Sequence, residues 1–216
     1  MAAIDLSPLN LRRAPARRGV QLFAGLTLYG ASMAMLTRAH LGLDPWDVLH
    51  EGLTKLTGLS FGTVTAIASV FVLLLWIPLR QKPGIGTVAN VVVIAVTVDA
   101  VRAVLPDQSV LIWQILTMVG GIVANAVATA VYVGTRLGPG PRDGLMTGLH
   151  ARTGWSVRLV RTGIEVLVLA CGWLLGGTAG AGTVLYALSI GPLTQALLPL
   201  ATWTREKEQH QRLPTA

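Results

Sequence analysis

The chain has 216 residues, of which 52% are hydrophobic and only 12% are charged. A soluble domain carries about twice that charged fraction, so the composition excludes an ordinary soluble protein and indicates one that lies in a membrane. The 17 lysines and arginines outnumber the 10 acids, but they flank apolar stretches and form no basic-aromatic module. We therefore expect no nucleic-acid partner.

Six apolar stretches are each long enough to cross the hydrocarbon core, which takes about 20 residues in a helix. The stretches are continuously apolar, whereas the strands of a membrane β-barrel alternate. We therefore predict an all-α polytopic membrane protein with six transmembrane helices. The predicted spans are 19–38, 61–79, 84–105, 110–135, 157–175 and 182–203.

The second half of the sequence repeats the first. Residues 41–100 align without a gap on residues 137–196, and 21 of these 60 positions are identical. Each half holds three spans, and a tandem copy of an odd number of spans must face the opposite way, so we predict two inverted three-helix repeats. The predicted divisions are a tail over 1–18, membrane repeats over 19–106 and 107–203, and a second tail over 204–216.

Each half carries a short connection between its first and second spans. In the first half, Asp44 suits a helix N-cap, Pro45 the first helical position and Gly58 the end of the helix. About a dozen residues at 1.5 Å each cover ~18 Å, too short to cross the bilayer. We therefore predict one short non-spanning helix in each half, lying either flat at the interface or re-entrant.

Basic residues are distributed unequally across this topology. Fourteen of the 17 lysines and arginines fall on one side. Because basic loops stay in the cytoplasm, we expect both termini to be cytoplasmic, with the lipid bilayer as a partner. The mass of 22.8 kDa is small for a transporter with a central pathway. A homodimer is compatible with that size, although no sequence pattern specifies one.

The two short helices carry aligned acids. Asp47 and Asp143 each occupy the third helical position. A carboxylate there either completes a capping box or, as one of a pair near the pseudo-twofold axis, handles a cation or proton. Arg142 lies in a rigid Gly/Pro-rich segment and suits a bound carboxylate or phosphate, unless it serves only as a basic residue at the headgroups.

Two further acids lie inside predicted spans, where ionisable groups usually mark function. Glu165 follows Arg161 by four residues and Asp99 precedes Arg102 by three, so each can also pair along its own helix. The candidate substrate- or ion-binding residues are accordingly Asp47, Arg142, Asp143, Glu165 and Asp99.

Motifs for catalysis and metal binding are missing from the sequence. The four histidines and Cys171 show no metal-ligand spacing. No nucleotide-binding loop, nucleophile elbow or zinc-protease motif occurs. We therefore expect no metal, no cofactor and no enzymatic activity.

Two strings resemble the YczE-type bacterial integral membrane proteins, which are related to the YitT group. They are Leu41-Gly42-x-x-Pro45-Trp46-Asp47 and Gly138-Pro139-Gly140-Pro141-Arg142-Asp143-Gly144. Arg161-Thr162-x-x-Glu165 and Gly191-Pro192 are also similar to that family. The resemblance covers residues 20–200 and implies a polytopic protein of the bacterial plasma membrane, but it implies no activity.

Inverted repeats with charged residues at membrane depth are typical of transporters and channels. We therefore expect a small-solute transporter or channel whose site, for a small molecule or an ion, lies between the repeats. The alternative is a non-transporting membrane protein that assembles with or regulates a partner through small-residue helix faces and basic inner loops.

Overall fold

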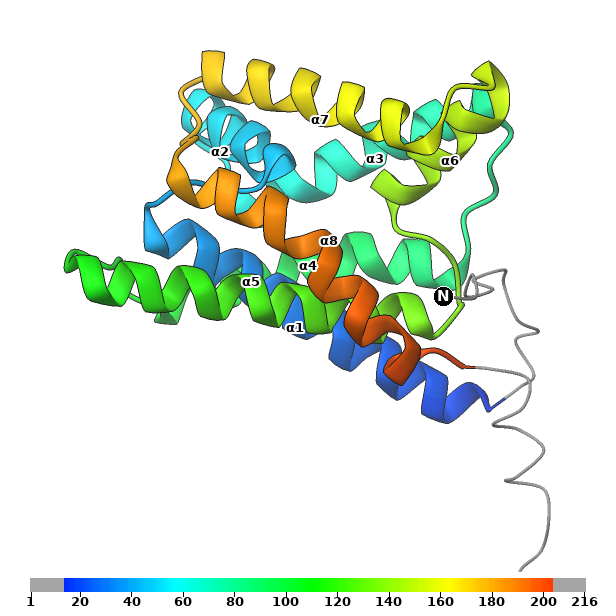
Figure 1. Ribbon diagram of the computed structural model, residues 1–216, viewed down its shortest axis with the longest axis horizontal. Coiled ribbons are helices and arrows are strands. Elements are labelled where there is room, and N and C mark those ends of the chain that lie inside the picture. The colour runs from blue at the N-terminus through cyan, green and yellow to red at the C-terminus, as the bar shows by residue number, and fades with distance from the viewer. Residues whose placement is uncertain (1–13, 204–216) are drawn as a thin grey trace, which may run out of the picture.

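Eight helices form the part of the chain that the computed structural model describes, residues 14–203 (Figure 1). The predicted tail over 204–216 and most of the one over 1–18 lie outside these residues, although the first helix already begins at Pro15. The helices are α1 (Pro15–Ala39), α2 (Pro45–Thr57), α3 (Phe61–Leu79), α4 (Ile85–Val104), α5 (Leu111–Gly134), α6 (Pro141–Thr153), α7 (Val157–Leu174) and α8 (Ala181–Ala201).

Five helices are long and apolar enough to cross a membrane, namely α1, α3, α4, α5 and α8. The all-helical fold with several apolar spans is therefore confirmed. The sixth predicted span, 157–175, forms α7 but is not among the five. Its 18 residues include Arg158, Arg161 and Glu165, whereas the three charged residues of α1 lie near the ends of a helix of 25 residues. The architecture of six spans is thus not established by helix length and apolarity.

The short helices begin and end as predicted. Asp44 caps α2 by accepting hydrogen bonds from the next two free backbone N–H groups, at 2.8 and 3.0 Å. Gly58 and Gly154 end α2 and α6 with φ angles of +71° and +72°, the left-handed region that favours glycine. Ser60 and Ser156 then cap α3 and α7. Local sequence chemistry therefore sets these boundaries.

The two halves are built alike. The helices of the second half begin at residues 111, 141, 157 and 181, each 96 residues after its counterpart at 15, 45, 61 and 85. Packing recurs as well: α1 lies against α5 in the centre, α4 covers α1, and α8 covers α5. Each short helix packs against the opposite half, α2 on α7 and α6 on α3. Each short helix therefore reaches across to the other half of the chain, and the two short helices meet between the halves.

Reciprocal hydrogen bonds tie the halves together. Gly86, at the start of α4, donates its N–H to the carbonyl of Leu137 at 3.0 Å. Gly182, at the start of α8, donates to the carbonyl of Leu41 at 2.8 Å. Both partners in the second contact are the repeat counterparts of those in the first. Equivalent backbone hydrogen bonds therefore join each half to the other.

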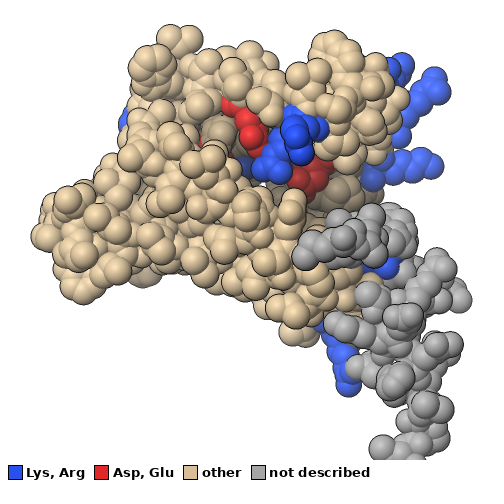
Figure 2. All heavy atoms as spheres, viewed as in Figure 1, with Lys and Arg blue, Asp and Glu red and all other residues tan. Residues whose placement is uncertain are grey.

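The exterior of the bundle is apolar. Val92 and Val96 of α4 and Leu116 of α5 are more than half exposed, while Leu26 and Leu36 of α1 are fully buried. An apolar exterior around buried polar groups is the arrangement that lipid favours. The described ends of the chain lie together, because Gln21 binds the carbonyl of Ala201 at 2.9 Å. Figure 2 shows lysines and arginines gathered at that end.

Candidate functional site

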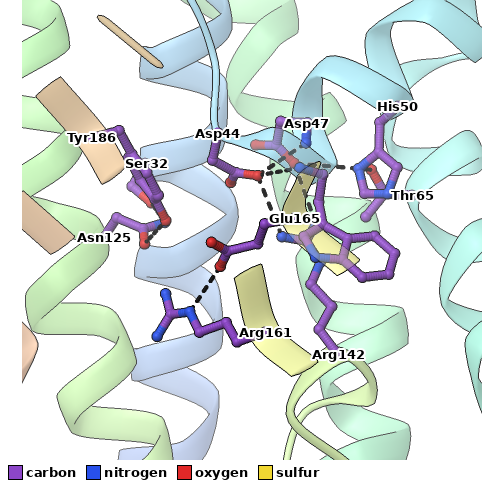
Figure 3. A network of polar contacts seen from close by, with 11 residues as sticks. Ser32, Asp44, Asp47, His50, Thr65, Asn125, Arg142, Arg161, Glu165 and Tyr186 are labelled. Carbon is purple, nitrogen blue, oxygen red and sulfur yellow. Dashed lines mark hydrogen bonds and ion pairs between the residues drawn. The ribbon is translucent and has the colours of Figure 1, made fainter. Parts of the chain in front are cut away.

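A cluster of charged side chains lies where α2 and α6 meet (Figure 3). Asp44 and Asp47 lie at the N-terminal end of α2, and Arg142 lies in the first turn of α6. Nη2 of Arg142 is 3.3 Å from Oδ1 of Asp47, and its Nη1 is 3.6 Å from Oδ1 of Asp44. One guanidinium from the second half therefore meets two carboxylates from the first.

Arg142 also stacks on its own repeat counterpart. Its guanidinium carbon lies 5.1 Å from the ring centroid of Trp46. Counterpart residues can touch each other only where the two halves meet, so this contact marks the centre of the repeat. Cation–aromatic stacking is worth about 2 kcal/mol where water is excluded.

His50 continues the cluster one turn along α2. Its Nδ1 is 3.2 Å from Oδ1 of Asp47 and 3.2 Å from the hydroxyl of Thr65 on α3. That hydroxyl donates its own hydrogen to the carbonyl of Phe61 at 2.8 Å, so Nδ1 is the donor toward Thr65 and Asp47. Burial lowers the pKa of His50 to about 3, which keeps the ring neutral near pH 7.

The carboxyl groups of α2 are incompletely satisfied. Asp44 and Asp47 are 2% and 0% exposed. Within the described part of the chain, the Oδ2 atom of each has no hydrogen-bond partner. Burial, together with the charge of Asp47, raises the pKa of Asp44 to about 6. Buried oxygens without partners are costly, so they indicate a group that binds there.

Asp143 lies beside Arg142 but faces a different partner. Its Oδ2 accepts a hydrogen bond from the hydroxyl of Tyr132, on α5, at 3.0 Å. The ring of Tyr132 meets that of Tyr29 edge-on, with centroids 5.9 Å apart. The two aligned acids therefore differ: Asp47 is sealed in the ion-pair cluster, and Asp143 lines open space.

Arg161 and Glu165 form the predicted pair along α7, with 2.8 Å between Nε and Oε1. Figure 3 shows the Glu165 side chain extending from α7 toward the cluster of Asp44 and Arg142. Glu165 is thus the one candidate on α7 that reaches the central site.

A cavity of about 230 Å³ separates α7 from α8, and most of these groups line it, although Asp47 and His50 do not. In Figure 2 its acidic and basic atoms lie in a hollow surrounded by uncharged residues. The elements that form it are α1, α2, α5, α6, α7 and α8. Its lining includes Tyr29, Asp44, Trp46, Thr129, Tyr132, Arg142, Asp143, Met146, Arg161, Glu165, Tyr186, Ile190, Thr194, Gln195 and Leu198.

A smaller cavity of about 60 Å³ lies between α1, α3, α4, α5 and α6. Eight of its eleven lining residues are repeat counterparts of residues in the larger cavity. Arg142, Asp143, Tyr29 and Tyr132 line both and therefore form the wall between them. The counterpart pairs are Met33 and Thr129, Asp44 and Gly140, Pro45 and Pro141, Trp46 and Arg142, Thr65 and Arg161, Ser69 and Glu165, Asn90 and Tyr186, and Ile94 and Ile190.

Helix packing explains the difference in size. In the first half, α3 lies so close to α4 that a Cβ atom at Gly62 would meet the carbonyl oxygen of Ala95. In the second half, α7 and α8 scarcely touch and diverge from their connecting turn (Figure 1). The two halves therefore hold counterpart cavities of different size, a wider, open cavity beside α7 and α8 and a narrower, closed cavity beside α3 and α4.

For Asp47 and Asp99, the structure does not show the local role that was one of the two alternatives for each. Asp47 does not complete a capping box, because its carboxylate faces Arg142 and His50. Asp99 does not pair with Arg102. It accepts hydrogen bonds from the backbone of Gly62, at 2.7 Å, and from Ser60, and so holds the start of α3 instead of joining the central site.

The sequence pointed to Asp44 only as a helix cap. The sequence did contain a signal, because the two halves differ at two neighbouring positions of the repeat. Asp44 aligns with Gly140, and Trp46 aligns with Arg142. These departures place two acids on one helix and the compensating cation on the other. Within residues 14–203, no three His, Cys, Asp or Glu side chains gather as a metal site would require.

Comparison with known proteins places the chain in a family. Residues 16–199 match the family of unknown function DUF6198. An uncharacterized protein of Haemophilus influenzae is 37% identical over 179 residues, 83% of this chain and 82% of that protein. The uncharacterized membrane protein YczE of Bacillus subtilis is 36% identical over 180 residues, 82% of this chain and 83% of that protein.

The uncharacterized protein YyaS of Bacillus subtilis is 24% identical over 180 residues, 82% of this chain and 90% of that protein. No solved structure matches the chain. The apolar helices, the extent of the family match and the similarity to YczE agree with the predicted resemblance. The chain is a membrane protein of the DUF6198 family.

Proposed function

We propose that this protein is a small-solute transporter built from two inverted repeats, with its substrate in the cavity between α7 and α8. The observation that carries the proposal is the pair of counterpart cavities, about 230 and 60 Å³, on either side of the wall formed by Arg142 and Asp143. Inverted-repeat transporters expose a central site to one side at a time by exchanging the conformations of their halves.

The structure supplies the parts of such an exchange. The wall is made by side chains from both halves, joined by the ion pair between Arg142 and Asp47. In the proposed opposite state, α3 moves away from α4 as α7 now lies away from α8, and the larger cavity closes. The two cavities share a wall, so one site is reached from either side in turn.

The open cavity faces the end of the bundle where the termini lie. It is lined by residues near the end of α8, including Gln195 and Leu198, and that end of α8 contacts the start of α1 through Gln21. Because basic residues gather at the same end, we assign it to the cytoplasm of a bacterium and the structure to an inward-open state.

The lining defines the substrate class. Arg142 and Arg161 supply positive charge, Asp143 and Glu165 supply negative charge, and tyrosine and threonine hydroxyls lie between them. A volume of about 230 Å³ lies below the roughly 300–1,000 Å³ of pockets for drug-sized ligands. We therefore propose a small polar solute that carries both charges, such as an amino-acid-sized zwitterion.

Cysteine accessibility tests the pathway. In a Cys171→Ser background, single cysteines replace Gln195 and Glu165 in the open cavity, and Ser69 and Asn90 in the closed one. Membrane-impermeant thiol reagents are applied to intact cells and to inverted vesicles. We expect positions 195 and 165 to label only from the cytoplasmic side, and 69 and 90 to label slowly. If 165 and 195 stayed unlabelled from both sides, the site would be dry and a non-transporting role with a protein partner would be favoured.

A solute screen tests the substrate class. Purified protein in detergent is heated with each of the standard amino acids, because a ligand that binds only the folded state raises the unfolding temperature. Solutes that stabilise the protein are then tested for uptake into proteoliposomes. Glu165→Gln should abolish both responses, whereas Asp107→Asn, in an exposed loop, should change neither. Uptake that is equal in Glu165→Gln and the unmodified protein would reject Glu165 as a site residue.

A further inference from the structure

The charge at the start of α2 is unbalanced. Two carboxylates, Asp44 and Asp47, face the single guanidinium of Arg142 at 3.6 and 3.3 Å. His50 lies 3.2 Å from Asp47 but is buried and neutral. The two buried carboxylates therefore carry one negative charge more than Arg142 compensates, which is costly in a low-dielectric interior.

Neighbouring elements do not supply the missing positive charge at contact distance. On α7, Arg161 is bound to Glu165 at 2.8 Å. On α4, Arg102 acts on Asp47 only through space and stacks on Phe61. On α6, Asp143 adds a further acid. The titratable side chains that α1 and α8 place in the cavity lining are Tyr29 and Tyr186, which carry no positive charge.

Each carboxyl group also has one oxygen that no described residue satisfies. Oδ2 of Asp44 and Oδ2 of Asp47 are buried without a hydrogen-bond partner, while their Oδ1 atoms are engaged by Arg142. A proton on one Oδ2 removes one charge and turns an acceptor into a donor. One proton thus corrects the charge. The O–H group that it forms can donate to the other carboxylate, because Asp44 and Asp47 lie within side-chain hydrogen-bond reach of each other.

We propose that Asp44 and Asp47 share one exchangeable proton and form the proton-coupling site of this protein. The proton binds one carboxylate as an O–H group, and the other carboxylate remains paired with Arg142. It leaves to water through Asp44, which lines the open cavity, whereas Asp47 does not. That this proton drives transport rests on the proposed function.

A metal cation fits the pair poorly. Hard metal cations such as calcium take about six to eight oxygen ligands, whereas only the Oδ2 atoms of Asp44 and Asp47 are without a partner here. Within the described residues, no three His, Cys, Asp or Glu side chains gather around them. A proton needs only one of these oxygens to bind and one to accept its hydrogen bond. The chemistry of the cluster therefore favours a proton over a sodium ion.

Infrared spectroscopy of the purified full-length protein tests the proposal without any substrate. The carbonyl stretch of a protonated carboxyl is followed as pH rises from 4.5 to 8. Ordinary carboxyls ionise near pH 4, but burial also raises the pKa of Asp143. All spectra are therefore recorded in an Asp143→Asn background, where a band that persists above pH 4 reports the shared proton. In Asp44→Asn and in Asp47→Asn, one acid remains for one guanidinium, and we expect the band to be lost.

The matched control is Asp99→Asn, which removes an acid bound to the start of α3 and should leave the band unchanged. Asparagine is as good a helix cap as aspartate, so Asp44→Asn keeps the cap and should fold. A band that persists in both variants of the pair, or the absence of any band above pH 5, would overturn the proposal. Loss of the band at constant pH on exchanging potassium for sodium would show a metal-cation site and overturn it too.

Transport assays separate this proposal from the proposed function. Once a solute is found, a proton gradient should stimulate its uptake in the unmodified protein but not in Asp44→Asn, whereas Asp99→Asn, outside the central site, should keep the full stimulation. A shared proton without any transport would sink the transporter proposal alone. Transport without a shared proton would sink the coupling site alone.

Discussion

Arg142 and Asp47 lie 95 residues apart in the chain and meet with 3.3 Å between Nη2 and Oδ1. Their contact joins the first turns of the two short helices, and it places the stacked counterparts Arg142 and Trp46 at the centre of the repeat. Arg142, which lies in the wall between the two cavities, thus also holds the halves together.

Removal of Arg142 should destabilise the fold strongly. Arg142→Gln leaves two buried carboxylates without their cation, a loss that typically costs about 3–5 kcal/mol. We expect the free energy of unfolding in detergent, followed by the loss of helical circular dichroism, to fall by that order. The double variant with Asp47→Asn should recover much of the loss. If the loss in the double variant equalled the sum of the losses in Arg142→Gln and Asp47→Asn, the pair would not be coupled.

Asn125 should contribute to the stability of the fold through two buried hydrogen bonds. It is fully buried, receives a hydrogen bond from Tyr186 at 2.9 Å and donates one to Ser32 at 2.9 Å. Asn125→Ala should lower the free energy of unfolding by about 1–3 kcal/mol, because two partners lose their bonds. Thr162→Ala, on the exposed face of α7, is the control and should change it little.

Close packing of α3 on α4 should be sensitive to a single methyl group. A Cβ atom at Gly62 would lie 2.1 Å from the carbonyl oxygen of Ala95, whereas one at Gly163 on α7 would meet nothing within 4 Å. Gly62→Ala should therefore cost about 1–3 kcal/mol or more, as overpacking does. It should also speed thiol labelling of a cysteine at Ser69, and Gly163→Ala should do neither.

The pH dependence of stability should carry an unusual sign. Burial raises the pKa of Asp44 from 3.8 to about 6, so between these values the folded state binds more protons than the unfolded state. Stability from this group therefore falls as pH rises through that window, the reverse of an ordinary paired carboxylate. His50 contributes the opposite slope, because burial lowers its pKa from 6.5 to about 3.

The variant Asp44→Asn isolates the first of these slopes while His50 stays in place. The free energy of unfolding is measured by denaturant titration in detergent for the variant and for the unmodified protein. The value for the variant minus the value for the unmodified protein should rise as pH goes from 4 to 6.5. A difference that stays constant over this range would mean that Asp44 has an ordinary pKa in the folded protein.

The sequence alone predicted the local features of this protein. Apolar stretches of about 20 residues predict membrane helices, whatever packs against them. The N-cap at Asp44 and the helix end at Gly58 depend on bonds within a few residues, and the offset of 96 predicted that the second half would repeat the helix bounds of the first. The ion pair of Arg161 and Glu165 was also predictable, since it spans one helical turn.

The tertiary structure alone decided which partners meet across the chain. Asp47 and Asp99 each had a plausible partner within one turn of its own helix. Packing between helices instead pairs Asp47 with Arg142 of α6 and Asp99 with the start of α3. The divergence of α7 from α8, with no such divergence between α3 and α4, also has no local signal. Caps and spans form from neighbours in the chain, whereas the site forms from side chains that only folding brings together.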